Sequence, residues 1–166
     1  MITLNNTKKD STNRYFEAYR HVRIFSDSLQ AVSDSLFYSF KDSVFRLYQD
    51  PIVWAKKSQI TGDTLLLFTK NKKADKLKAF NNSFLVNEVE TGIYNQVQSN
   101  RMDGWFTKGD IDSVRSAGEA QCIYFIQDED SAYTGINESK AEILDTNYKK
   151  KALSKIVFRT QVTGTI

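Results

Sequence analysis

Three Asp-Ser pairs within the segment Ser26–Leu47 carry side chains of the kind used in nucleophilic or acid–base catalysis. They are Asp27-Ser28, Asp34-Ser35 and Asp42-Ser43. A serine nucleophile needs a general base beside it, but the only histidine, His21, precedes an alternating run and is expected to face solvent. The sequence contains no Gly-x-Ser-x-Gly elbow, phosphate-binding loop or Gly-x-Gly-x-x-Gly fingerprint. The sequence therefore predicts a protein that is not an enzyme.

The residue types that would bind a metal or a cofactor are sparse. The single cysteine, Cys122, excludes an internal disulfide, and its place in the apolar run CIYFI favours a buried, inert thiol. The acidic segment QDEDSAY lacks the ligand spacing of a calcium loop, so Asp128, Glu129 and Asp130 are expected in a turn. We therefore expect no cofactor and no metal.

Charge and hydropathy argue against two other classes of partner. The net charge of +3 is spread along the chain, and the lysine-rich stretches FTKNKKADKLK and YKKKALSK lack an interleaved aromatic stacking motif, so no nucleic acid is expected. No apolar run approaches the roughly 20 residues needed to span a membrane. The start of the sequence, MITLNNTKKDSTN, has no apolar core of a signal peptide.

The elements that would position these side chains are short strands. The sequence contains 11 Phe, 8 Tyr and 2 Trp but one proline, a bias typical of β-structure. Runs such as HVRIF and SLFYSF alternate between turn-forming clusters. The segment Leu29–Phe40 also has apolar residues at helical spacing, although its Ser and Asp content favours a strand. We predict one all-β antiparallel domain over residues 14–166, built as a sandwich, a jelly roll or an open barrel-like sheet, after a polar, disordered segment over residues 1–13.

A weak internal repeat organises the expected strands. Four segments share a strand–turn–strand plan, and their anchor residues are spaced by 33, 37 and 42 residues: Val44, Leu77, Val114 and Ile156. Such units cannot bury an apolar face alone, so they must stack, and stacking leaves the two end strands free to pair with another chain. The repeated Asp-Ser then marks turns, with its side chains bonded to local backbone.

A pattern of small and apolar residues recurs in the stretches QITGDTLLLF, NRMDGWFTKGDIDSVRSAGEAQCIYFI and YTGINESKAEI. It consists of Gly62-Asp63 before a strand, Gly104-Trp105-Phe106 at a strand start, Val114, Gly118 and Ala120 at a strand end, and Tyr133, Gly135 and Asn137. On these residues the chain, from about Tyr15 to Ile166, resembles the OstA-like family. This family includes the LptA-type periplasmic lipopolysaccharide transport proteins and the N-terminal domain of their outer-membrane partner.

The resemblance implies an open antiparallel β-jelly roll, or β-taco, that acts without catalysis. Such a domain would carry lipopolysaccharide across the periplasm towards the outer membrane, with the lipid A acyl chains in an apolar groove. Its partners would be this lipid and other OstA-like domains, joined through edge strands into a head-to-tail homo-oligomer. The candidate groove residues are the four anchors and two large aromatic residues: Val44, Trp54, Leu77, Trp105, Val114 and Ile156.

A second interpretation is a β-repeat module for protein interaction or scaffolding in the cell envelope, with a filled core and no lipid. Consecutive apolar residues, as in Leu65–Phe68 and Ile123–Ile126, fit both interpretations because they can either pack on two faces or line a groove. The last residues, QVTGTI, stop where another strand could follow, a pattern expected of one part of a longer protein.

Overall fold

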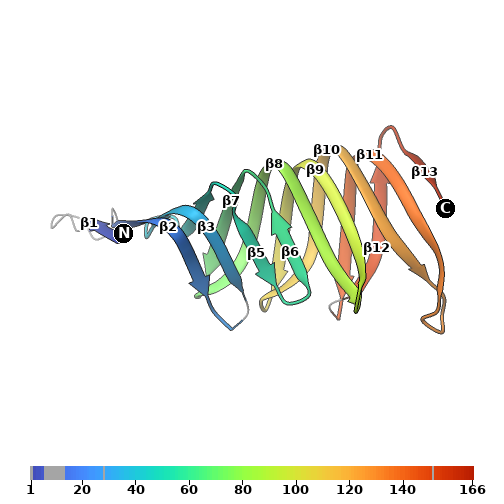
Figure 1. Cartoon of the computed structure of the whole chain (residues 1–166), viewed down its shortest axis with the longest axis horizontal. Helices are drawn as coiled ribbons and strands as arrows, with labels where there is room; N and C mark the ends of the chain where they lie inside the picture. Colours follow the sequence, from blue (N-terminus) through green and yellow to red (C-terminus); the bar gives the residue numbers. More distant parts are fainter. Residues whose placement is uncertain (1, 6–13, 28, 151) are drawn as a thin grey trace.

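The computed structural model describes residues 2–5, 14–27, 29–150 and 152–166, which form a single antiparallel sheet (Figure 1). In chain order its strands are β1 (Ile2–Asn5), β2 (Tyr15–Phe25), β3 (Gln30–Ser39), β4 (Val44–Tyr48), β5 (Ile52–Ala55), β6 (Ser58–Thr61), β7 (Thr64–Lys70), β8 (Lys73–Glu90), β9 (Ile93–Thr107), β10 (Asp110–Gln127), β11 (Tyr133–Lys149), β12 (Ala152–Arg159) and β13 (Thr163–Thr165). Within the described ranges there is no helix long and apolar enough to cross a membrane. The predicted all-β antiparallel fold is confirmed, and β3 occupies the segment for which a helix was the alternative.

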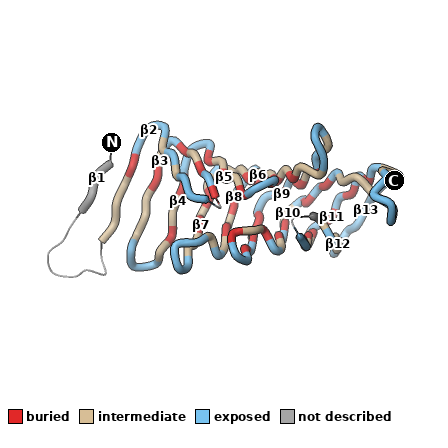
Figure 2. Tube along the Cα trace, turned by 90° about the horizontal axis from the view of Figure 1, so that it is seen from below, coloured by how far each residue is buried: buried red, intermediate tan, exposed pale blue. Residues whose placement is uncertain are grey.

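The sheet is folded lengthwise into two walls that meet at a spine and leave a mouth between their free edges (Figure 1). One wall, called here the β4–β7 wall, also contains β12. The other, the β5–β6 wall, also contains β13. The long strands cross the spine and belong to both walls, as β8 does by pairing with β7 through residues 73–80 and with β6 through residues 84–87. Figure 2, which looks into the mouth, shows buried and exposed residues alternating along the strands.

Pairs of residues in the left-handed conformation bend the strands at the spine. Their φ angles lie between 48° and 80° at Arg20-His21, Gln49-Asp50, Asn81-Asn82, Gly118-Glu119 and Thr160-Gln161. The pairing register between adjacent strands shifts by one residue at such a bend. For example, Asn81 and Asn82 of β8 lie opposite the single residue Asn100 of β9. Such bulges bend a strand and increase its twist. Glycine is needed at position 118, where a Cβ would lie 2.9 Å from the Asn100 side chain.

Three of the four repeat anchors lie in one row across the sheet. The row contains, in order, Phe45, Leu67, Leu77, Gly104, Val114, Thr146 and Ile156. Leu77, Val114 and Ile156 are therefore structurally equivalent. The anchor of the first unit must be corrected from Val44 to Phe45, because a slip of one residue along a strand turns the side chain to the opposite face.

The polar segment over residues 1–13 was expected to be disordered. Four of its residues form β1, which pairs Ile2 with Ala18 and Asn5 with Tyr15 of β2. The other residues of this segment lie outside the described ranges, as does Ser28.

Candidate functional site

The inner faces of both walls are mainly apolar, because side chains alternate across each strand. One inner row contains Ala18, Leu36, Leu47, Leu65, Ala79, Met102, Ser116 and Leu144. Leu47, Leu65 and Leu77 are 0% exposed, and burying each such side chain stabilises the fold by about 1.5–3 kcal/mol. Side chains therefore fill the centre of the interior.

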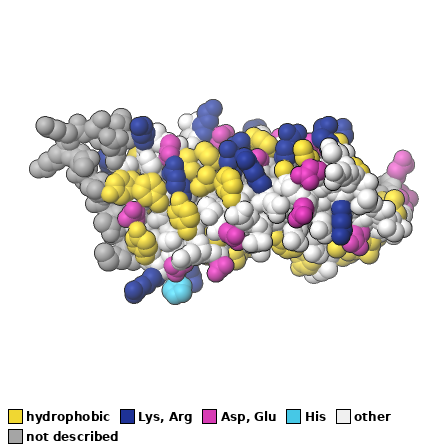
Figure 3. Space-filling view, turned by 90° about the horizontal axis from the view of Figure 1, so that it is seen from above, with side chains coloured by type: hydrophobic (Ala, Val, Ile, Leu, Met, Phe, Trp, Pro, Cys, Tyr) yellow, Lys and Arg dark blue, Asp and Glu magenta, His cyan; other side chains and the backbone are white. Residues whose placement is uncertain are grey.

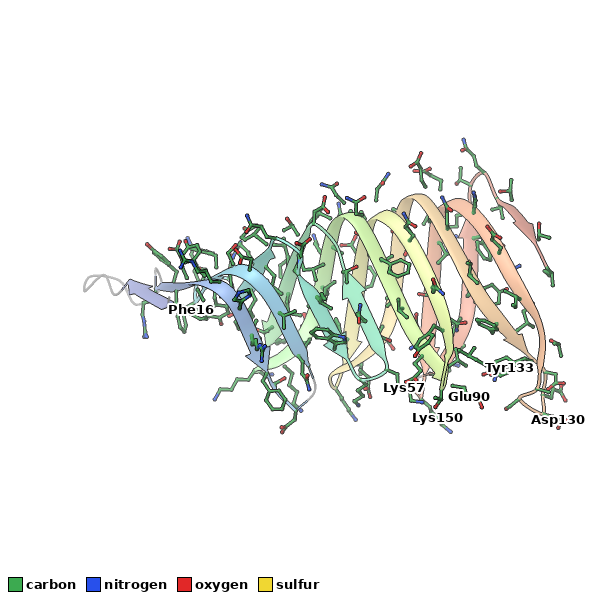
Figure 4. The ribbon with its side chains drawn as sticks, viewed as in Figure 1. Phe16, Lys57, Glu90, Asp130, Tyr133 and Lys150 are labelled. Carbon is green, nitrogen blue, oxygen red and sulfur yellow. The ribbon has the colours of Figure 1, made fainter. Side chains whose placement is uncertain are left out.

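Towards the C-terminal end the walls separate around a groove of about 610 Å³. It lies between the mouth ends of β8, β9 and β10 and the beginning of β12. Leu153 and Ile156 form its apolar side on the β4–β7 wall, and both pack against the core. Figure 4 shows Lys57, Glu90 and Lys150 at the mouth in this region. The interior is thus accessible at this end.

An ion pair bridges the mouth near the middle of the molecule. There the ammonium of Lys56, in the β5–β6 turn, forms a salt bridge with Asp110 at the start of β10. The two residues belong to opposite walls, so the ion pair joins the two edges of the mouth. Tyr148 lies beside this contact, and its burial raises its pKa to about 12. The phenol is therefore neutral at ordinary pH.

The two edges of the mouth differ in charge. Exposed lysines follow the turns of the β4–β7 wall, at Lys41, Lys70, Lys72, Lys73, Lys108, Lys149 and Lys150. The edge of the β5–β6 wall carries Lys56 and Lys57 but is acidic towards the C-terminal end, at Glu90, Asp128, Glu129 and Asp130. The lysine-rich edge could therefore contact an anionic group held at the mouth.

The structure places three of the six candidate groove residues on the inner face. Leu77 and Val114 are 0% and 1% exposed and belong to the packed core. Ile156 is partly buried and lines the groove directly. Of the three, Ile156 is therefore the residue that a ligand can reach without displacing the core.

The inward orientation expected for Val44, Trp54 and Trp105 must be corrected. Val44 is only 3% exposed, but it alternates with Phe45, which lies opposite Leu67 on the inner face. Trp54 lies between the core residues Val53 and Ala55 of β5, so it points to the outer face. Trp105 is 37% exposed and its ring lies 5.0 Å from the ammonium of Lys76. Figure 3 shows Lys and Arg side chains interspersed with hydrophobic side chains on this outer surface. The error arises because neighbouring residues of a strand point to opposite faces, and the sequence pattern did not indicate which face is the inner one at these positions.

Asp42-Ser43 lies at a turn, as predicted, whereas Asp34-Ser35 lies inside β3, so the prediction that the repeated Asp-Ser marks turns is wrong at that pair. The Asp42 carboxylate accepts a hydrogen bond from the Val44 backbone N–H at 3.1 Å, and hydrogen bonding to Arg46 lowers its pKa. The backbone N–H of Asp34 donates to the carbonyl of Gln49 across the spine. The local bonding predicted for Asp42 is therefore confirmed.

Groups that could support other chemistry are buried or scattered. Cys122 is 2% exposed, and its burial raises the thiol pKa to about 11, so the predicted buried thiol is confirmed. His21 lies at the spine in the left-handed conformation. Among the described residues, no cluster of three or more His, Cys, Asp or Glu side chains is arranged to hold a metal ion.

Three groove residues, Asn87, Asn95 and Leu153, escaped the sequence prediction. Asn87 and Asn95 are buried polar residues that line the groove and lie directly opposite each other on β8 and β9. The turn at Thr91-Gly92 between them is the signal that could have paired them, because a tight turn fixes the register of its hairpin. Leu153 was missed because it adjoins the lysine-rich turn after β11.

Comparison with known proteins finds a similar structure but no similar sequence. No protein-family model matches the sequence, and no curated protein sequence does. A crystal structure of LptH from Pseudomonas aeruginosa, described as the LptA homologous periplasmic component of the conserved lipopolysaccharide transport device, superposes with a TM-score of 0.65. The match covers 83% of this chain and 94% of LptH at 12% sequence identity. The chain therefore has an LptA-type fold, the fold of the OstA-like family that its sequence resembles.

Proposed function

We propose that this chain is a periplasmic bridge domain that carries lipopolysaccharide towards the outer membrane, with the acyl chains of the lipid in its interior. The observation that carries the proposal is the inner apolar face, which opens at the C-terminal end into a groove lined by Leu153 and Ile156. Each methylene group buried there would contribute about 0.8 kcal/mol to binding. The likeness to LptH, a periplasmic component of lipopolysaccharide transport, supports the assignment of ligand and compartment.

The charge at the mouth supports an orientation of the lipid in which its acyl chains point into the interior and its phosphates stay at the mouth. Acyl chains inside the groove would leave the phosphates of lipid A at the mouth, where Lys150 and its neighbours on the β4–β7 wall are exposed. In this arrangement the protein needs no catalytic group, and transport would draw its energy from elsewhere. Edge pairing with further domains of the same fold would extend the groove, because β1 and β12, as described, each pair with one neighbour along the sheet.

A photo-crosslinking residue placed at Ile156 tests the proposal. We expect it to capture lipopolysaccharide, whereas the same residue at Trp105, on the outer face, should not. Both variants would first be compared by circular dichroism to verify that they fold. Absence of an adduct at Ile156, or equal yields from the two positions, would contradict a lipid-binding interior.

A second candidate function is an assembly module of the cell envelope without a lipid ligand. The packed centre favours it, since Leu47, Leu65 and Leu77 are 0% exposed there. This alternative predicts concentration-dependent assembly through the edge strands together with no lipid adduct at any inner position. Sedimentation of the protein with and without lipopolysaccharide, combined with the crosslinking experiment, distinguishes the two.

A further inference from the structure

A row of buried polar side chains crosses the inner face of the β5–β6 wall, just inside the mouth. Ser58 lies opposite Asn87, and Asn87 lies opposite Asn95. On the next two strands, Tyr124 lies opposite Asn137. The Ser58, Asn87, Asn95 and Asn137 residues are only 4–7% exposed. Asparagine is uncommon in buried strand positions, so the three on this face require an explanation.

Hydrogen bonds within the protein occupy only part of this polar row. Asn87 Nδ2 donates to Ser58 Oγ at 2.9 Å, and Asn95 Oδ1 accepts from the Phe125 backbone N–H at 3.0 Å. Neither bond uses Asn87 Oδ1 or Asn95 Nδ2. Asn87 and Asn95 both line the 610 Å³ groove, and neither spare atom is among the fully enclosed unpaired atoms of the described residues. An acceptor and a donor therefore face the groove on adjacent strands.

The polar row lies between a charged edge and an apolar floor. Nearer the mouth, the groove is lined by Lys57 and Lys150. Two residues deeper along each strand, about 7 Å away, the inner row is apolar and consists of Ile60, Leu85, Val97 and Cys122. Leu153 and Ile156 form the apolar side opposite. An amphiphile lying in this groove would meet charge first, then neutral hydrogen-bonding groups, then hydrocarbon.

We propose that Asn87 and Asn95 bind the amide group that joins an acyl chain to the polar head of an amphiphile. This inference rests on the proposed function and adds the chemical class that the groove selects. A secondary amide offers one N–H donor and one carbonyl acceptor, which match Asn87 Oδ1 and Asn95 Nδ2. An ester offers acceptors alone and would leave Asn87 Oδ1 without a partner. The polar row itself contains no charged side chain, so its ligand group is neutral.

The test compares two amphiphiles that differ in this linkage, N-dodecanoylglucosamine and 2-O-dodecanoylglucose, by titration calorimetry. The wild-type protein should bind the amide about tenfold more tightly, which corresponds to one additional satisfied hydrogen bond. Asn95→Asp keeps the acceptor for the Phe125 N–H but removes the Nδ2 donor, and Asn87→Leu removes the acceptor. Each variant should lose the preference for the amide. Gln98→Leu, an exposed change on the same strand β9, is the matched control and should retain it.

The outcomes separate this inference from the proposed function. Equal binding of amide and ester by the wild-type protein would overturn the amide site while leaving the acyl groove intact. A preference that survives in a folded Asn95→Asp or Asn87→Leu variant would overturn the assignment to these residues. If neither amphiphile binds to the wild-type protein, the groove and the amide site both fail. Because the wild-type preference is measured first, the test remains decisive even if one variant does not fold.

Discussion

The hydroxyl of Ser116 lies between Met102 and Leu144 in the inner row, is 0% exposed and has no hydrogen-bond partner among the residues that the structure describes. A buried hydroxyl without a partner destabilises the folded state by about 1–3 kcal/mol. Ser116→Ala should therefore raise the free energy of unfolding by about 1 kcal/mol, measured by urea denaturation. Ser139→Ala is the matched change, because Ser139 Oγ donates to Asn137 Oδ1 at 2.6 Å, and it should be destabilising. Destabilisation by Ser116→Ala would show that the hydroxyl has a partner.

The carboxylate of Asp145 makes stability depend on pH. Hydrogen bonds from Arg115, at 2.7 Å, and from Arg159, at 3.0 Å, hold the pKa of Asp145 below its usual range. A depressed pKa in the folded state stabilises the protein above the unfolded value of about 4, and this contribution is lost as the pH falls through the folded value. The stability difference between wild type and Asp145→Asn should therefore be full at pH 7 and shrink below about pH 4. A difference that stays constant in urea titrations down to pH 2.5 would contradict the ion-pair assignment.

At the scale of the strands, the bends at the spine depend on left-handed residues. Gly118 has φ +80°, and an added Cβ would meet the Asn100 side chain at 2.9 Å, whereas Gly92, at φ +83°, has open space around it. Gly92→Ala should cost about 1–2 kcal/mol through its backbone conformation alone. Gly118→Ala should cost more, because crowding against Asn100 adds to the same backbone term. Thermal unfolding of both variants measures this difference. Equal losses of stability would contradict the crowding of a Cβ at position 118 against Asn100.

Sequence patterns predicted the elements of this protein better than the faces of those elements. The density of turn signals and aromatic residues was enough to predict an antiparallel all-β fold, and the repeat brought Leu77, Val114 and Ile156 into one row. The predicted inward orientation was wrong at Val44 and Trp105. Runs such as VFRLY and DGWF have apolar residues on both faces of the strand, so their alternation does not indicate which face is inner. The groove residues Asn87 and Asn95 could not be found by searching for apolar positions.

At the scale of the whole molecule, the interior changes from closed to open along its length. The inner row is sealed around Leu47 and Leu65, and the mouth is joined by the Lys56–Asp110 ion pair. Beyond this contact the groove opens beside β12, the last strand along the sheet path. A ligand that binds this chain alone should therefore occupy the C-terminal end, and filling the centre would require the walls to separate.

The central claim is that acyl chains enter the groove at β12, and methyl NMR tests it most directly. The protein would be labelled at Ile and Leu methyl groups and titrated with lipopolysaccharide in a detergent-free, solubilised form. The account predicts intermolecular nuclear Overhauser effects from acyl methylenes to Ile156 and Leu153, and none to Ile143, whose side chain alternates with the buried Leu144 and so points to the outer face. Contacts confined to outer-face methyls such as Ile143, or no contacts at all, would contradict it.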